Sequence, residues 1–441
     1  MRRIGSYAEA EAYLLGTIDE TVSPRTSYKL DRIRALLREL GDPHRAYPTI
    51  HVGGTSGKGS TATMIAAALQ AAGKRIGLHT KPHLFEMTER ARIDGAPISH
   101  ERFGELLDEM LPAIARAAEH YGRPTYYETL LALSFKYFAD ERADVAVIEV
   151  GLGGRFDGTN VILPVVAAIT SVGYDHTDVL GSTIEAIALE KAGIAKPGVP
   201  LVLALVPAAA QDVIERYAAE VRARVVRVSD VVRVERERGE DRGGQVLSVA
   251  TRRGSYRLRL AVSGTFQRTN AATAIAVLEE LGDDLRPGPE AIARAFGEVV
   301  IPGRMELVWA NPTVVFDIAH NAEKAESLVA SLRESFPNRR VHYVIAIGES
   351  KDARRIIEIL GSVASTFTFT SFAAAGRRAI RPQRLATIAE SLGAWGRAIS
   401  DPLEALTVAR RIAANDDVVV VTGSTFVVAG LREWYMPTAV T

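Results

Sequence analysis

The chain has 441 residues, with 53 Lys plus Arg, 53 Asp plus Glu, a hydrophobic share of 47% and no cysteine. This charge balance excludes the broad basic field that favours nucleic-acid binding, and the lack of cysteine excludes disulfides, a catalytic thiol and thiolate metal ligands. No run of about 18 apolar residues occurs, so we expect a soluble, cytoplasmic protein of two or three domains whose partners are small molecules, not nucleic acid or a membrane.

The first predicted elements lead to a phosphate-binding loop. An amphipathic helix is predicted over Ser27–Leu40, and a short apolar strand then enters HVGGTSGKGST at 51–61, followed by a helix over Ser60–Ala72. Glycines let backbone N–H groups converge on an anion, the helix N-terminus is positive, and Lys58 adds a full charge. An ordinary glycine-rich turn is the alternative. The strand–loop–helix context favours a nucleoside triphosphate site.

Two later strands end in groups that suit Mg²⁺. Glu149 lies near the carboxyl end of one apolar run, and His176 follows the end of the next, which we expect to be a neighbouring strand. A Glu149–Arg155 ion pair and a structural histidine are the alternatives. With the hydroxyl of Ser60 or Thr61, these groups predict metal ligands beside the phosphates.

The rest of the chain predicts a second α/β domain. Further short strands are predicted over 75–80, 200–205, 225–228, 246–250 and 256–262. Lys191 lies on a predicted helix whose charged residues by themselves indicate a solvated face. The last two of the listed strands are predicted to form a hairpin, and a further helix is predicted to start at Ala271. After a linker at 301–304, strands alternate with helices again, with polar strand ends at 317–321 and 422–425. These features leave a kinase, an ATPase motor and an ATP-dependent ligase open.

Nine motifs in order resemble the folylpolyglutamate synthase and dihydrofolate synthase family, within the Mur-type ATP-dependent amide ligases. They are HVGGTSGKGST at 51–61, PHL at 82–84 followed by Glu-Arg at 89–90, EVGLGGRFDGTNVI at 149–162, ITSVGYDH at 169–176, EKAGIAKPGVP at 190–200, GTFQRTN at 264–270, PGRMEL at 302–307, DIAHN at 317–321 and TGS at 422–424. The resemblance implies an α/β protein with a P-loop domain of the Mur ligase central type over 1–301, built on a mostly parallel sheet. It also implies a Rossmann-like, glutamate-binding α/β domain of the Mur ligase C-terminal type over 302–441.

The resemblance also implies a reaction. ATP phosphorylates the carboxylate of a folate-type acceptor, and the amine of L-glutamate attacks the acyl phosphate to give an amide, ADP and phosphate. The motifs leave open whether the acceptor is dihydropteroate, tetrahydrofolate or both. The family implies a monomer. Alternatives are a Mur-type ligase with a different carboxylate acceptor and a non-catalytic nucleotide-binding homologue.

The family motifs imply roles for particular residues of this chain. Those implied to bind ATP are Thr55, Ser56, Gly57, Lys58, Gly59, Ser60, Thr61, Gln267, Asn270, Arg304 and Asp317. Those implied to hold two Mg²⁺ ions are Ser60, Glu149 and His176. Those implied to be catalytic are Lys58, Lys191 in a carbamylated form, and His320. Those implied to bind the acceptor are His83 and Asp157, and those implied to bind glutamate are His320 and Ser424.

Three positions depart from the family pattern. Lys81 stands where the family usually has serine before Pro-His-Leu, so a cation replaces a hydroxyl near the expected acceptor and metal region. Ser56 replaces an asparagine in the phosphate loop, and Phe266 replaces a histidine beside the expected adenine site. We expect the change at Lys81 to matter most, because it introduces a full charge.

Overall fold

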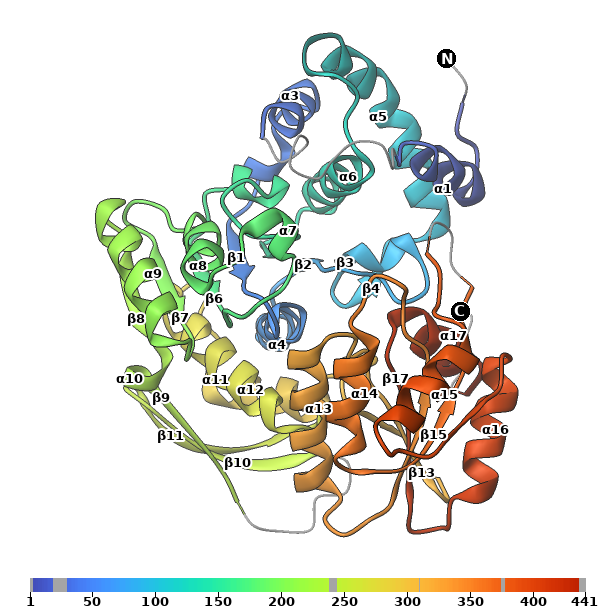
Figure 1. The fold of residues 1–441 in the computed structure, drawn as a ribbon. Coiled ribbons are helices and arrows are strands. Elements are labelled where there is room, and N and C mark those ends of the chain that lie inside the picture. The colour runs from blue at the N-terminus through green and yellow to red at the C-terminus, as the bar shows by residue number, and fades with distance from the viewer. Residues whose placement is uncertain (1–2, 19–29, 238–243, 309, 374–376, 436–441) are drawn as a thin grey trace. The chain divides into compact units, whose positions relative to one another are not determined.

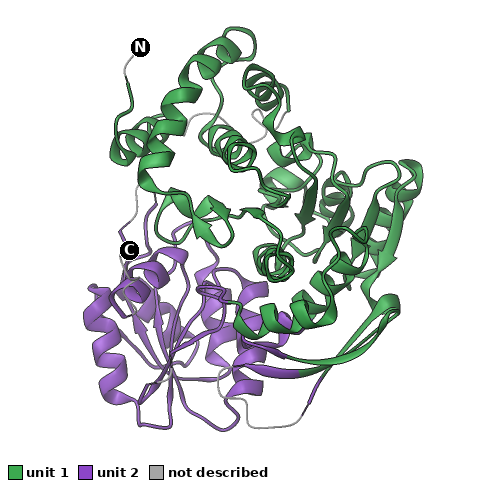
Figure 2. Cartoon of the chain, turned by 180° about the vertical axis from the view of Figure 1, so that it is seen from behind, with its two compact units in different colours: residues 1–235, 247–258, 269–299 green, residues 236–246, 259–268, 300–441 purple. Residues whose placement is uncertain are grey.

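The computed structural model describes residues 3–18, 30–237, 244–308, 310–373 and 377–435, which form two compact units (Figure 1). Unit 1, green in Figure 2, comprises Met1–Glu235, Leu247–Leu258 and Thr269–Val299. Unit 2, purple in Figure 2, comprises Arg236–Val246, Arg259–Arg268 and Val300–Thr441. Two short segments that precede the predicted linker therefore cluster with unit 2. The domain boundary at 301 stays a prediction.

Within its described residues, unit 1 holds an eight-stranded sheet in the order β4-β3-β2-β5-β1-β6-β7-β8. The strands are β1 Thr49–Gly53, β2 Ile76–His79, β3 Ala91–Ile93, β4 Ala96–Pro97, β5 Val145–Glu149, β6 Val166–Ile169, β7 Pro200–Leu203 and β8 Arg224–Arg227. Neighbours from β2 to β8 pair in parallel, and β3 and β4 pair antiparallel at one edge. The prediction of a mostly parallel sheet is confirmed.

The strand of the phosphate loop has a central position. β1 pairs with β5 on one side, with Val52 opposite Glu149, and with β6 on the other. The expectation that the strands leading to Glu149 and His176 are neighbours is therefore wrong. Both strands are apolar and equally suited to a buried parallel sheet, so their pattern could not specify their order. Their carboxyl ends flank the phosphate loop on opposite sides.

Helices pack on the sheet of unit 1 to give two hydrophobic cores (Figure 1). The helices are α1 Tyr7–Leu15, α3 Asp31–Glu39, α4 Lys58–Ala71, α5 His100–Tyr121, α6 Tyr126–Asp140, α7 Thr177–Leu180, α8 Ile184–Ala192, α9 Ala208–Glu220, α10 Val228–Val231 and α12 Pro289–Glu298. One core joins α1, α3, α5 and α6 to β5, and the other joins α8 and α9 to β6 and β7. Residues 27–29 of the first predicted helix lie outside the described residues.

Helix α11 spans Thr265–Glu279, so the predicted start at Ala271 is wrong. The stretch from 265 to 270 contains neither glycine nor proline, and its polar residues resemble a loop although they are compatible with a helix. Gln267 and Asn270 consequently lie three residues apart on a helix, where side chains at that spacing share one face.

A separate three-stranded sheet has the order β11-β10-β9. Its strands are β9 Val232–Arg236, β10 Gln245–Thr251 and β11 Gly254–Leu260. The adjacency of β10 and β11 confirms the predicted hairpin. The sequence does not predict strand β9, because its alternating charged residues are typical of an exposed segment.

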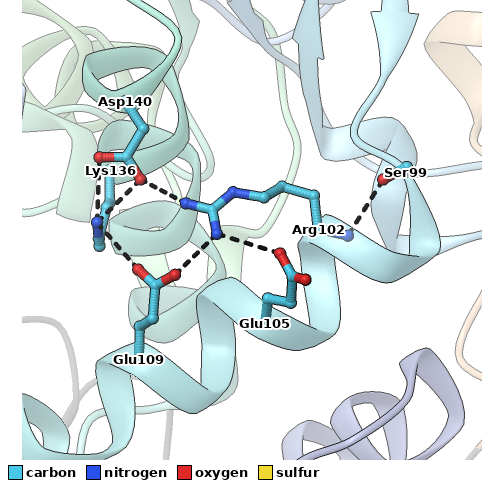
Figure 3. A network of polar contacts seen from close by, with 6 residues as sticks. All are labelled: Ser99, Arg102, Glu105, Glu109, Lys136 and Asp140. Carbon is cyan, nitrogen blue, oxygen red and sulfur yellow. Dashed lines mark hydrogen bonds and ion pairs between the residues drawn. The ribbon is translucent and has the colours of Figure 1, made fainter.

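A polar network ties α5 to α6 (Figure 3). The Arg102 guanidinium lies 2.8 Å from Glu109 Oε1 and 2.8 Å from Asp140 Oδ2, and Lys136 Nζ lies 2.9 Å from the same Asp140 oxygen. These side chains are partly exposed, so each pair contributes only about 0–1 kcal/mol. Together they help to fix the position of α6, whose first turn carries Tyr127 of the site described below.

Unit 2 is a second α/β unit, as predicted. In its described residues a six-stranded sheet has the order β12-β13-β17-β14-β15-β16, with β12 antiparallel to β13 and the others parallel. The strands are β12 Glu306–Val308, β13 Thr313–Phe316, β14 Val341–Ile345, β15 Ala364–Phe369, β16 Gly396–Ala398 and β17 Val418–Thr422. The helices are α13 Ala322–Ser335, α14 Ala353–Gly361, α15 Pro382–Ser391, α16 Pro402–Ile412 and α17 Thr425–Tyr435. No described helix of the chain is both long and apolar enough to span a bilayer.

A buried polar chain supports the sheet of unit 2. His342 on β14 makes hydrogen bonds to Thr366 Oγ1 at 2.9 Å and to Asp417 Oδ2 at 2.9 Å. The same Asp417 oxygen accepts from the Ala414 N–H at 2.8 Å. Burial opposes ionisation of Asp417, but the hydrogen bonds from Ala414 and His342 hold its pKa below the usual value. The carboxylate therefore stabilises the fold in its ionised form.

We predict that Asp417→Ala destabilises unit 2 by about 1–3 kcal/mol, because it leaves the buried His342 and the Ala414 N–H without their acceptor. Since the folded pKa is lowered, this stabilisation is present above the unfolded pKa of about 4 and is lost as the pH falls through the folded value. Calorimetric melting at pH 7 and at acid pH measures it. The control is Asp416→Ala, because Asp416 is the exposed neighbour of Asp417. Equal melting temperatures of the two variants would contradict the role given to Asp417.

Candidate active site

The phosphate loop follows β1 and is built on glycines with positive φ. Gly57 caps the N-terminus of α4 at φ 83°, and a Cβ there would overlap Asn270 Oδ1. Gly54 has φ 142°, and a Cβ there would overlap Thr170 Oγ1. Both positions therefore need glycine for conformation and for space. The strand–loop–helix context predicted for this segment is confirmed.

Hydrogen bonds from the end of β6 hold the loop in place. Ser171 Oγ accepts from the Ser56 N–H at 2.7 Å, and Thr170 Oγ1 donates to the Ser56 carbonyl at 2.6 Å. The Thr55 N–H donates to the Ser171 carbonyl at 3.0 Å. Ser56 is thus fixed at both its N–H and its carbonyl. This order is a feature of preorganised anion sites.

Lys58 begins α4, and its ammonium donates to the carbonyls of Gly54 at 2.9 Å and Thr55 at 3.1 Å. The Lys58 side chain therefore lies over the phosphate loop to which its own backbone belongs. Ser60 and Thr61 follow in the first turn, with exposed fractions of 3% and 0%. The positive end of α4 and Lys58 together suit an anion at this place.

Glu149 faces the first turn of α4. Its carboxylate is buried, and a Cβ at Gly59 would lie 3.2 Å from Glu149 Oε2, so glycine permits this close approach. No group of three or more His, Asp or Glu that could hold a metal ion occurs in the described part of the chain. Glu149 and the Ser60 hydroxyl nevertheless fit Mg²⁺, which usually binds one or two protein ligands together with phosphate oxygens and water.

His176 and Lys191 lie in different surroundings. His176 has φ 50° before the short helix α7, and its side chain is half-exposed, with Nε2 3.9 Å from Asp175 Oδ1. Lys191 on α8 is only 2% exposed, so the solvated face indicated by its helix is wrong for this residue. Helix α8 packs tightly on the glycine-rich loop over 151–158, where a Cβ at Gly154 would lie 2.8 Å from the Glu190 carbonyl. The roles of His176 and Lys191 as metal-supporting groups stay predictions.

Asp157 is the centre of a buried network. Its Oδ1 accepts from Tyr127 Oη at 3.0 Å and from Thr159 N and Oγ1 at 3.0 and 2.6 Å, and its Oδ2 accepts from Leu152 N at 2.8 Å. Thr159 Oγ1 also pairs with His51 Nε2 on β1 at 2.8 Å. The carboxylate predicted to bind the acceptor therefore organises the loop around it.

A basic cluster follows β2. Arg90 Nε donates to His83 Nδ1 at 3.0 Å, and burial together with the Arg90 charge lowers the pKa of His83 to about 4. Burial and repulsion by Lys58 lower the pKa of Lys81 to about 8, against opposing attraction from Glu149. His83 is thus neutral at pH 7. Lys81 remains mostly cationic.

In unit 2, Asp317 follows β13 and holds the polypeptide beside it. Its Oδ2 accepts from Met305 N at 2.8 Å and its Oδ1 from Ala319 N at 2.9 Å. Burial raises the pKa of Asp317, while the charge of Arg304 opposes that change. The Arg304 charge therefore acts on the Asp317 carboxyl, and the roles of both residues in binding ATP stay predictions.

His320 is a neutral imidazole with a defined tautomer. Its Nδ1 lies 2.8 Å from the Ile318 carbonyl and its Nε2 lies 3.2 Å from Lys324 Nζ. Burial and the Lys324 charge lower the pKa of His320 to about 3. The proton is therefore on Nδ1, and Nε2 is the acceptor.

The remaining predicted residues are buried near helix N-termini. Gln267 and Asn270 on α11 are 0% and 6% exposed. Ser424 is 7% exposed and precedes α17, where its Oγ accepts from Phe426 N at 3.2 Å. Their contacts with substrates stay predictions.

Several residues of these networks have no role assigned from the sequence, although three of them belong to the motifs quoted above. They are His51, Arg90, Tyr127, Thr159 and Lys324. Tyr127 and Lys324 lie on helices with no motif signal, and only folding brings them to Asp157 and His320. Arg90 follows the Pro-His-Leu motif and is part of the family resemblance, but only the structure shows that it contacts His83.

Two family models match successive parts of the chain. A family model described as "Mur ligase middle domain" matches residues 52–278, and one described as "Mur ligase, glutamate ligase domain" matches residues 303–425. Fold and site therefore define a Mur ligase, with the phosphate loop in the middle domain.

The similar proteins are more specific. The chain is 34% identical over 434 residues to the dihydrofolate synthase/folylpolyglutamate synthase of Bacillus subtilis, covering 97% of this chain and 99% of the relative. The crystal structure of Thermotoga maritima folylpolyglutamate synthase superposes with a TM-score of 0.86 at 32% identity, covering 99% and 98% of the two chains. E. coli FolC in complex with DHPP and ADP gives a TM-score of 0.87 at 29% identity, covering 99% of each chain. The chain belongs to the folylpolyglutamate synthase and dihydrofolate synthase family.

We predict that Gly57→Ala weakens binding of the ATP analogue AMPPCP by about tenfold or more, because the new Cβ displaces either the loop or Asn270. Gly73→Ala is the matched control. Gly73 lies just past the other end of α4 at φ 86°, and a Cβ there would meet no atom within 4 Å. Both variants carry the left-handed strain of about 1–2 kcal/mol. Titration calorimetry measures the affinity, and equal affinity of the two variants would contradict the geometry assigned to the loop.

Proposed function

We propose that the chain catalyses the ATP-dependent ligation of L-glutamate to the carboxylate of a folate-type acceptor, giving an amide, ADP and phosphate. The observation that carries this proposal is the phosphate loop held against the buried Glu149, in a chain that belongs throughout its length to this family. A kinase or a motor ATPase would not need the glutamate ligase domain that is matched over 303–425, so these two classes are less well supported than a ligase.

The first chemical step is phosphoryl transfer, which is mainly a matter of position and charge. We assign the triphosphate to the loop of residues 55–61, with Lys58 on the β- and γ-phosphates. Ser60 and Glu149 would hold Mg²⁺, which neutralises charge on the transferred group when bound. His176 and a carbamylated Lys191 are proposed to support a second ion. The acceptor carboxylate attacks the γ-phosphorus, and the bond to the β–γ bridging oxygen breaks.

The second step is attack of the glutamate amine on the acyl carbon. The nitrogen forms the amide bond as the acyl C–O bond breaks, phosphate leaves, and the amine loses a proton. We assign glutamate to His320 and Ser424, and further contacts with the nucleotide to Gln267, Asn270, Arg304 and Asp317. Because His320 is neutral, its Nε2 is a hydrogen-bond acceptor that can orient the N–H groups of the glutamate amine once Lys324 releases it.

The acceptor is assigned to the loop that carries Asp157 and to His83. The relative E. coli FolC was crystallised with DHPP and ADP, which supports a folate-type acceptor for this chain. The choice between dihydropteroate and tetrahydrofolate stays open. A monomer in the cytoplasm is what the family implies, and both points stay predictions.

We predict that purified protein with ATP, Mg²⁺ and L-glutamate adds one glutamate residue to dihydropteroate or tetrahydrofolate, with ADP released only when an acceptor is present. Mass spectrometry of the pterin product and an ADP assay measure this. Acceptor-independent ADP release, or an unchanged pterin mass, would contradict the proposed function.

We predict that Lys58→Ala and Glu149→Gln each lower kcat by at least about 100-fold, because each removes charge stabilisation of the transferred phosphoryl group. Lys74→Ala, which removes a lysine beyond the other end of α4, should keep wild-type turnover. Melting temperatures establish that the variants are folded. Wild-type turnover in Lys58→Ala or in Glu149→Gln would rule out the phosphate and metal assignment.

A further inference from the structure

Lys81 presents an ammonium that the fold itself does not use. The residue follows β2, and its backbone N–H donates to Glu149 Oε2 at 2.9 Å. Its side chain is partly buried, yet within the described residues its Nζ has no hydrogen-bond or ion-pair partner. Withdrawing an ammonium from water without a partner costs free energy. Its position is therefore better explained by a ligand than by stability.

The charges around Lys81 favour an incoming anion. Lys58 and Arg90 repel the ammonium, whereas Glu149 and Asp157 attract it. The Asp157 oxygens already accept four hydrogen bonds from other groups of the chain, and one oxygen of Glu149 accepts the Lys81 N–H. Cations gathered in this way are stabilised when a polyanion binds between them.

The neighbours of Lys81 belong to both halves of the expected reaction. Lys58 marks the phosphate loop and Asp157 marks the acceptor loop, and Lys81 lies within electrostatic range of both. Resting on the proposed function, we propose that the Lys81 ammonium is a catalytic cation that contacts the acceptor carboxylate and the γ-phosphoryl group during phosphoryl transfer. It thereby adds a positive charge to that of Lys58 beside the phosphate loop.

The step that Lys81 assists is balanced without any further reactant. A carboxylate oxygen of the acceptor forms a bond to the γ-phosphorus, and the bond from that phosphorus to the β–γ bridging oxygen breaks. The electron pair of the broken bond leaves with ADP, and no proton moves. Two anions must approach each other in this step, so a fixed ammonium between them lowers the barrier through charge that needs no reorganisation.

The experiment compares wild type, Lys81→Met and the matched control Lys74→Met in the glutamate-addition assay. Methionine keeps most of the length and apolar volume of the lysine stem and removes its charge. We expect Lys81→Met to lower kcat by about 100-fold while KM for ATP changes little, because the contact is made mainly in the transition state. Lys74→Met should retain wild-type kinetics.

A binding measurement supplements the kinetics. ADP with aluminium fluoride and the pterin acceptor mimics the transferred phosphoryl group, whereas AMPPCP mimics bound ATP. We expect Lys81→Met to weaken the aluminium fluoride complex by at least about tenfold and to leave AMPPCP affinity nearly unchanged. Equal weakening of both complexes would indicate a disturbed phosphate loop and would overturn the inference.

The kinetic outcomes separate this inference from the proposed function. If the wild-type chain adds no glutamate, both the proposed function and the role of Lys81 are wrong. If the wild type is active and Lys81→Met is equally active, only the role of Lys81 is wrong.

Discussion

The site depends on the hydrogen bonds that fix the phosphate loop to the end of β6. The N–H groups at the start of a helix have no partner within that helix, so the order of the loop that precedes α4 has to come from other segments. Thr170 and Ser171 provide it, by engaging both the N–H and the carbonyl of Ser56. Because β1 lies between β5 and β6, the same loop meets Glu149 on its other side.

The acceptor side is organised by a second buried anion. Asp157 receives donors from its own loop and from Tyr127 on α6, and Thr159 carries the network to His51 on β1. A buried carboxylate is tolerated only when donors satisfy it, and this one is satisfied on both oxygens. The phosphate loop and the loop of Asp157 therefore share β1 as a common support, which explains how unit 1 keeps two buried carboxylates at defined positions.

Sequence patterns fail at particular elements for local reasons. The strands β14 and β17 are predictable because each has five buried residues. By contrast, β12 and β16 are only three residues long and none of these residues is fully buried, so they offer no period to detect. The predicted start of α11 falls six residues late, since its first turns are polar and resemble a loop. The sequence locates the polar strand ends at Asp317 and Ser424 but says nothing of their hydrogen-bond partners.

The sequence by itself determined the fold class, the phosphate loop and the family, because these rest on glycines, apolar runs and motifs that are contiguous in the chain. Only the tertiary structure decided that β1 separates β5 from β6, that Lys191 is buried, and that Tyr127 meets Asp157. It also decided the surroundings of Lys81, which the sequence marked only as an unusual residue. The reason is physical: strand order, burial and charge at a site are set by residues far apart in the chain, and local periodicity carries no information about which of them meet.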